Sequence, residues 1–422
     1  MSVPTIVARM LTGTFLILAC SASRPFAVAT EPEWRKFRGP TENGYAPSDS
    51  NPPTQWSTGQ NIAWRSELPG EGWSTPVASG GKVYLSAAIP TDEADQFDLS
   101  LLIVDFETGK LVSSIALMRQ SGDAKIHKKN SHASPTPIVT DDRVYVHFGY
   151  QGTACCDRTG KILWTNRDLK FKPTHGNGGT PVLVGDRLIF TCDGDKEPKI
   201  VALDAATGEL VWQVRRPVDA KKTFSFCTPC VIEVEGRTQV VAPGSDCVLA
   251  LDPATGETIW DVRYTGYSVV PQPIFDDGRV YVSTSFDNAS LLAIRPTGKG
   301  IVTETHVDWQ TDRNVPKTPS MIAVDGAIYF VSDNGILSSV DGETGDLVYR
   351  ERLGGGFSAS PVYAGGHLYF VDEEGMTTVV KPGDEFQQVA RNDLQERTLA
   401  SPAVIGNAIL IRTEKALYRI EQ

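Results

Sequence analysis

The sequence predicts an all-β fold, a single eight-bladed β-propeller built of four-stranded blades. Two sequence markers recur in phase along the chain, and the segments between them alternate apolar and polar residues as β-strands do. Segments with helical periodicity are nearly absent after the N-terminus. A repeating unit that cannot bury its own apolar face alone is typical of ring and solenoid architectures.

The first marker is a short apolar strand, a turn containing Asp and Thr-Gly, and a second strand that ends in an aromatic residue. Its clearest copies are Val201–Trp212, Leu249–Trp260, Ala154–Trp164 and Ser339–Tyr349. Glycine can take the positive φ that such a turn needs, and Asp and Thr can hydrogen-bond the local backbone. The aromatic side chain is a large apolar surface, so it must be buried somewhere.

The second marker is a small polar residue followed by proline. Its eight copies are Thr75-Pro76, Thr136-Pro137, Thr180-Pro181, Thr228-Pro229, Gln272-Pro273, Thr318-Pro319, Ser360-Pro361 and Ser401-Pro402. A period of about 44 residues with four strands in each unit is that of a propeller blade.

The chain also indicates how the ring closes. The eighth unit, from Pro402 to Gln422, has room for only three strands. The segment Asn61–Trp64 resembles an isolated fourth strand with its Trp, placed just before the first blade. We predict that this N-terminal strand completes the last blade, because an open strand edge is an aggregation hazard.

Residues 1–29 have the features of a signal peptide. Arg9 supplies positive charge, Met10–Ala19 is an apolar core, and Ala27-Val28-Ala29 fits a cleavage site. This core is too short to span a bilayer, so no transmembrane segment is expected. An alternative is lipoprotein processing, with a lipid anchor at Cys20. Either way we expect an exported protein in the periplasm or cell envelope.

We expect residues 30–60 to form an irregular N-terminal arm and residues 61–422 to form the propeller. The formal net charge is −11, and the chain has no basic cluster. Both features argue against nucleic acid and anionic membrane surfaces as partners.

The non-repeating polar and aromatic residues cluster just ahead of the proline markers. In a propeller these linkers lead into the innermost strands, so they should surround one mouth of the central channel, where convergent polar groups indicate a ligand site. The alternative is that Ser, Asn and Gly only satisfy backbone groups at the crowded centre. The candidate ligand-binding residues are Trp73, Asn130, His132, His175, Asn177, Ser225, Tyr267, Lys317 and Arg397.

No catalytic or metal-binding residue is predicted. The turn Asp recurs in blade after blade, whereas a catalytic acid is needed only once. Cys227-Thr-Pro-Cys230 falls on a predicted inner strand, where residues three apart are about 10 Å apart, beyond disulfide reach. No second such motif completes a zinc site, and only His132 and His175 lie on the predicted rim.

The Trp-bearing repeats resemble those of pyrroloquinoline quinone (PQQ)-dependent alcohol dehydrogenases, which are eight-bladed propellers. In that family two adjacent cysteines form a disulfide against the quinone, and a Glu, an Asn and an Asp surround calcium. Here Cys155 and Cys156 align with the strand residues Ala202 and Leu203 of the next unit, which favours a structural role. The calcium-binding Glu and Asn match no motif of this chain.

In size the chain is similar to the propeller scaffold lipoprotein of the outer-membrane β-barrel assembly machine, which works through protein contacts. The segments Trp34–Pro40, Lys129–Pro135, His175–Gly179 and Arg412–Lys415 resemble exported PQQ-like propellers common in planctomycete-type bacteria. These resemblances imply the fold more strongly than the chemistry.

Two functions follow as hypotheses. The first is an exported, non-catalytic propeller that binds a protein or a small ligand at the channel mouth, with no cofactor expected. The alternative is a PQQ- and calcium-dependent dehydrogenase that oxidises an alcohol or a sugar.

Overall fold

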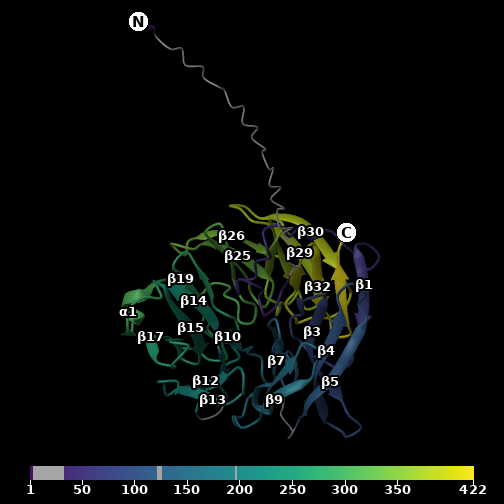
Figure 1. Cartoon of the computed structure of the whole chain (residues 1–422). Helices are drawn as coiled ribbons and strands as arrows, with labels where there is room; N and C mark the ends of the chain where they lie inside the picture. Colours follow the sequence, from purple (N-terminus) through teal and green to yellow (C-terminus); the bar gives the residue numbers. More distant parts are fainter. Residues whose placement is uncertain (3–32, 121–125, 195–196) are drawn as a thin grey trace. The chain divides into compact units, whose positions relative to one another are not determined.

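The computed structural model describes residues 1–2, 33–120, 126–194 and 197–422. From residue 33 onward the chain forms eight antiparallel sheets, each of them a blade, around a common centre (Figure 1). This arrangement confirms the predicted eight-bladed β-propeller. The predicted signal peptide lies almost wholly outside the described residues.

The blades follow one another along the sequence, and their strands run from the centre outward in chain order. Blade 1 consists of β2 (Val77–Ser79), β3 (Lys82–Pro90), β4 (Phe97–Asp105) and β5 (Leu111–Arg119), and blade 2 consists of β6 (Ile138–Val139), β7 (Arg143–His147), β8 (Thr153–Asp157) and β9 (Ile162–Asn166). Blade 3 consists of β10 (Val182–Val184), β11 (Arg187–Cys192), β12 (Lys199–Asp204) and β13 (Leu210–Arg215), and blade 4 consists of β14 (Cys230–Val234), β15 (Arg237–Gly244), β16 (Cys247–Leu251) and β17 (Thr258–Arg263).

Blades 5 to 8 have the same plan. Blade 5 consists of β18 (Ile274–Asp276), β19 (Arg279–Ser283), β20 (Leu291–Ile294) and β22 (Val307–Thr311), and blade 6 consists of β23 (Ile322–Val324), β24 (Ala327–Val331), β25 (Ile336–Asp341) and β26 (Leu347–Arg352). Blade 7 consists of β27 (Val362–Ala364), β28 (His367–Val371), β29 (Met376–Lys381) and β30 (Gln387–Asp393), and blade 8 consists of β31 (Ala403–Ile405), β32 (Ala408–Arg412), β33 (Ala416–Ile420) and β1 (Ile62–Glu67).

Additions to this plan are small. The strand β21 (Gly300–Ile301) pairs in parallel with β17, so blade 4 has a fifth strand. Helical structure in the described chain is limited to η1 (Gly149–Gln151) and α1 (Thr303–His306). Within the described residues, no helix has the length and apolar character needed to cross a membrane.

The closure of the ring is the predicted one. The strand β1 pairs antiparallel with β33, so a strand from before the first blade is the outermost strand of the last blade. Figure 1 shows β1 beside the C-terminal strands. The Trp64 indole on β1 then donates to Phe106 O of blade 1 at 2.9 Å. Blade 8 is therefore fastened to blade 1 by the N-terminal strand.

The same contact recurs between neighbouring blades and explains the aromatic residue of the repeat. Trp164 on blade 2 donates to Ala205 O at 3.1 Å, in the turn of blade 3. Gly208 in that turn has φ of +76°, and a Cβ there would come within 2.4 Å of the Trp164 ring. Trp212 and Trp309 donate in the same way to the turn of the following blade, where only glycine leaves room for the ring. Trp260 is the exception, because its indole donates to Gln239 Oε1 of its own blade at 2.8 Å.

A ring of hydroxyl groups joins the blades at the centre. We call this ring the hydroxyl collar; it comprises Thr75, Thr136, Thr180, Thr228, Ser320, Ser360 and Ser401, each two residues before an inner strand. The backbone N–H of one blade donates to the hydroxyl of the next. The six bonds run from Thr75 to Thr136 (3.0 Å), Thr136 to Thr180 (2.9 Å), Thr180 to Thr228 (2.9 Å), Gln272 to Ser320 (2.9 Å), Ser320 to Ser360 (3.0 Å) and Ser360 to Ser401 (2.9 Å).

The collar corrects the predicted register of the sixth unit. The sequence marker there is Thr318-Pro319, but β23 begins at Ile322, so Ser320 holds the collar position. Met321 takes the place that proline has in the other blades, and Thr318 donates instead to Asp333 Oδ1 at 2.6 Å. The small polar residue is thus the constant requirement, and the proline after it is replaceable.

The collar gives a prediction about stability. Replacing Thr136 by Val keeps the side-chain shape but leaves the buried Thr75 N–H without its acceptor, so we expect a loss of about 1–3 kcal/mol in the free energy of unfolding. The Thr75 hydroxyl is buried and has no hydrogen-bond partner, so Thr75→Val breaks no hydrogen bond and should not lower the free energy of unfolding. Urea unfolding of both variants measures the difference. Equal losses in the two variants would show that the collar acts through packing alone.

Candidate functional site

One end of the central channel is covered by the arm, residues 33–60. Trp34 exchanges two backbone hydrogen bonds of 2.9 Å with Ala78, and Val139 N donates to Arg35 O at 2.9 Å. Ala78 and Val139 lie in the inner strands β2 and β6, past the collar. The arm therefore binds the face opposite the linkers that lead into these strands.

Phe37 of the arm reaches the channel from that side and lines a cavity whose other walls are the linkers. Beside Phe37 the buried Arg38 donates to Met321 O of blade 6 at 2.7 Å. The arm thus contributes to the wall of the cavity, which has a volume of about 420 Å³ and is lined otherwise by the linkers where the candidate residues were predicted.

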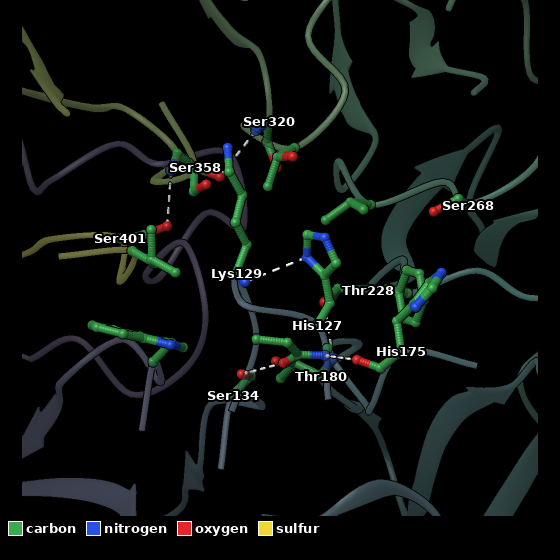
Figure 2. Close-up of a pocket in the computed structure, with 18 of the residues that line it drawn as sticks. His127, Lys129, Ser134, His175, Thr180, Thr228, Ser268, Ser320, Ser358 and Ser401 are labelled. Carbon is green, nitrogen blue, oxygen red and sulfur yellow. Dashed lines mark hydrogen bonds between the residues drawn. The ribbon is translucent and has the colours of Figure 1, made fainter. Parts of the chain in front are cut away.

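The cavity is lined by hydroxyls, aromatic rings and a few basic groups, drawn in part in Figure 2. All seven residues of the hydroxyl collar line the cavity. The other lining residues are Phe37, Trp73, His127, Lys129, Asn130, Ser134, His175, Gly178, Lys222, Phe224, Phe226, Tyr267, Ser268, Val270, Phe286, Thr318, Ser358 and Leu399.

Aromatic rings from blades 2 to 5 form a continuous wall. The ring centroids of His127 and His175 are 5.7 Å apart, and those of His175 and Phe224 are 5.3 Å apart. Phe224 contacts Tyr267 at 5.5 Å and Phe226 at 6.1 Å. Such edge-to-face and tilted pairs hold one another in place. The wall is therefore a pre-formed apolar surface next to a polar floor.

The charged groups at the cavity are basic. Lys129 Nζ lies 2.6 Å from Glu373 Oε1, which also accepts from Ser358. Lys222 Nζ lies 3.7 Å from the centroid of the Tyr267 ring and 4.0 Å from Asp287 Oδ2. No Asp or Glu is among the described residues that line the cavity.

Four of the nine predicted residues line the cavity: Trp73, Asn130, His175 and Tyr267. Two more support its aromatic walls from behind. Arg397 lies 5.2 Å from the Trp73 ring centroid and Lys317 lies 5.2 Å from the Phe286 ring centroid.

His132, Asn177 and Ser225 do not line the cavity. His132 packs on Phe97 at 4.8 Å, and burial lowers its pKa to about 4. Asn177 packs against Gly149 of η1, where an added Cβ would lie 2.1 Å from the Asn177 Cγ.

Ser225 shows why a predicted linker residue can lie outside the cavity lining. It donates to Asp193 Oδ2 at 2.9 Å, inside a fully buried pair with Arg216 that joins blades 3 and 4. Its neighbours Phe224 and Phe226 line the cavity instead. Successive residues of an extended segment point to opposite sides, so in this linker the two aromatic residues face the cavity.

The wall residues His127, Lys222 and Phe286, and the floor residue Phe37, were not predicted. His127 and Lys222 stand in the same linkers as predicted residues, so proximity to the proline marker was the available signal. Phe37 belongs to the arm, and nothing local in the sequence places it in the channel.

The cysteines of the described chain are buried and unpaired. Cys155 and Cys156 lie on opposite faces of β8: Cys155 packs with blade 3 residues such as Phe190, and Cys156 with blade 1 residues such as Val104. A disulfide between them would break this strand. Burial raises the pKa of the Cys155 thiol to about 11 and that of Cys156 to about 12, so both are neutral core groups. Across the same described ranges, no three His, Cys, Asp or Glu side chains gather as a metal site.

The fold and its Trp-bearing repeats define a PQQ-like eight-bladed propeller. A family model described as "Outer membrane protein assembly factor BamB" matches residues 152–299, 227–321 and 303–416, which together are more than half of the sequence. The chain belongs to this family. A comparison with curated proteins finds no match.

Solved structures of two kinds share the fold. BamB from Moraxella catarrhalis matches with a TM-score of 0.59 and 15% identity, over 85% of this chain and 99% of that one. The quinohemoprotein alcohol dehydrogenase from Comamonas testosteroni matches with a TM-score of 0.67 and 12% identity, over 92% of this chain and 80% of that one. A europium-containing methanol dehydrogenase matches with a TM-score of 0.65 and 12% identity, over 90% of this chain and 89% of that one. At these identities the likeness shows the fold alone.

A buried histidine of blade 2 predicts a pH dependence of stability. His147 at the end of β7 is held neutral, because burial lowers its pKa to about 3. Below about pH 6.5 the unfolded chain takes up a proton that the folded chain does not, so this contribution to stability is complete above pH 6.5 and is lost as the pH falls toward 3.

The protonation of His147 changes the free energy of unfolding by at most about 1.4 kcal/mol per pH unit. We expect His147→Gln to flatten the fall in unfolding free energy between pH 6.5 and 4, measured by urea unfolding. The same change at the partly exposed His367 is the control. Parallel curves for wild type and His147→Gln would contradict the assignment.

Proposed function

We propose that the chain is an exported, non-catalytic binding module that holds a small ligand in the cavity at the channel mouth. The observation that carries this proposal is the combination of Phe37 from the arm, the hydroxyl collar and an aromatic wall in one cavity of about 420 Å³. This volume is that of a small-molecule site, and apolar walls with a few convergent polar groups are typical of such sites. The predicted signal peptide supports the export.

The lining residues argue against the calcium-dependent dehydrogenase. Calcium is held by several oxygen ligands, normally including carboxylates. The cavity lining in the described chain offers only the neutral oxygens of Asn130 and the hydroxyls, and the nearby Glu373 is paired with Lys129. Cys155 and Cys156 lie within a blade, packed on both sides, and do not line the cavity.

A scaffold that contacts a partner protein is the second candidate. The family description names an assembly factor, and four outer strands begin with a pair of exposed apolar residues. These pairs are Leu111-Val112, Ile162-Leu163, Leu210-Val211 and Leu347-Val348. A partner segment could add to such a strand edge.

Equilibrium dialysis against PQQ, with and without calcium, separates the binding module from the dehydrogenase. The mature chain is purified from the cell envelope, and its first residue, Thr30 or Cys20, identifies how the leader was processed. We expect no calcium-dependent binding at tens of micromolar and no reduction of an electron-accepting dye with alcohols or sugars. Stoichiometric, calcium-dependent binding with dye reduction would establish the dehydrogenase.

Thermal unfolding with pooled small molecules tests the module directly. A ligand of the cavity should raise the Tm of the wild type and not that of Trp73→Ala. The outer-strand variant Leu347→Ser with Val348→Ser is the control, and it should keep the ligand response. Loss of the response in that control alone would favour the scaffold.

A further inference from the structure

The collar presents hydrogen-bond donors to the cavity. A hydroxyl group has one donor and two acceptor sites. Six collar hydroxyls each accept one backbone N–H, yet none of them donates a hydrogen bond to another described residue. Their O–H groups are therefore free to bind whatever fills the cavity. A ligand that fits this floor must carry many acceptor atoms.

Thr75 provides an independent indication of a ligand. Its side chain is 1% exposed and lines the cavity, and its hydroxyl has no hydrogen-bond partner at all in the described chain. An unpaired buried hydroxyl costs free energy, so a native structure normally supplies a partner from outside the protein. The Thr75 oxygen itself is closed off from solvent, so a ligand in the cavity reaches it only when the Thr75 side chain rotates toward the cavity.

The charge of the mouth selects an anion. In a chain of net charge −11, the cavity lining holds two lysines and no described acidic residue. Behind the wall, Lys317 and Arg397 contact aromatic rings and form no ion pair with a described carboxylate. Lys129 and Lys222 are each ion-paired, with Glu373 at 2.6 Å and with Asp287 at 4.0 Å. Among these described residues, the unpaired basic groups are therefore Lys317 and Arg397, and these favour a negatively charged ligand.

The aromatic wall selects a ring-shaped body. His175, Phe224 and Tyr267 on one part of the wall and Trp73 on blade 1 give flat apolar surfaces next to the donor floor. A sugar ring can pack its C–H face on such surfaces while its oxygens reach the donors around the collar. An aromatic acid would stack equally well, but it carries acceptors only at its acid group.

We propose that the cavity binds an acidic sugar, a mono- or disaccharide that carries a carboxylate or a sulfate group. This inference rests on the proposed binding function and specifies its ligand. In this complex the sugar oxygens accept from the collar hydroxyls and from Thr75. The acid group lies toward Lys222, whose only described carboxylate neighbour is Asp287 at 4.0 Å.

Isothermal titration calorimetry with a matched set of probes tests the proposal. The set is glucuronate, glucose 6-sulfate, glucose and benzoate, each at low and high salt. We expect one of the two acidic sugars to bind at least about tenfold more tightly than glucose, with an affinity that falls as salt rises. The tighter of the two identifies the acid group. Benzoate should bind more weakly than the acidic sugar.

Variants locate the binding. Lys222→Gln should lower the affinity for the acidic sugar by about tenfold and leave glucose unchanged, whereas Thr75→Val should weaken both. The control is Lys381→Gln, at the end of β29 on the face away from the mouth, which removes the same charge and should change neither. Unfolding curves for each variant show whether it is folded.

Glucose binding as tightly as both acidic sugars, or benzoate binding more tightly, would overturn the acidic-sugar proposal. So would the absence of binding by both acidic sugars at millimolar concentration. If another small ligand raises the Tm of the wild type and not that of Trp73→Ala, the proposed binding module stands and only the proposed ligand class fails. If no small ligand does so, both fail together.

Discussion

The structure depends on how backbone groups are satisfied where eight chain segments meet at the centre of the ring. A buried N–H without an acceptor is costly, and no sheet ladder reaches the residues just before the inner strands. The collar solves this in six of the eight blades with a Thr or Ser whose oxygen accepts from the neighbouring blade. Thr and Ser serve because they bring an acceptor on a short side chain.

This solution also creates the chemistry of the cavity. Six of the seven collar oxygens use an acceptor site for the neighbouring blade and keep their O–H donor, so a structural ring becomes a donor-lined floor. The two readings of these residues, as supports for the backbone and as a ligand site, are therefore compatible. The outer contacts also support the collar, because Trp164 and its equivalents hold neighbouring blades at the spacing that the collar hydrogen bonds require.

Much of the fold could be predicted because each blade repeats the same local solution. The turn of Asp204 and Gly208 and the strand that ends in Trp212 recur, and the missing fourth strand of the last blade pointed to β1. The register of one unit was wrong at Thr318, because proline was taken as the constant of the marker. The hydroxyl of Ser320 is what the neighbouring blade requires.

The site was predictable as a region and not as a set of side chains. The linkers ahead of the inner strands do surround the mouth, as chain direction in a propeller dictates. Which residue of a linker faces the cavity depends on the alternation of an extended chain, and this separates Phe224 and Phe226 from Ser225. Phe37 arrives from the arm by a long-range contact, which no local pattern records.

The most direct test of this account is a high-resolution crystal structure of the mature chain that shows ordered water and bound molecules in the channel. The account predicts density for water or ligand oxygens within hydrogen-bond distance of Thr75 Oγ1 and of several other collar hydroxyls, with the backbone-to-hydroxyl bonds intact. A collar whose hydroxyls donate to protein carbonyls, with Thr75 paired inside the protein, would contradict it.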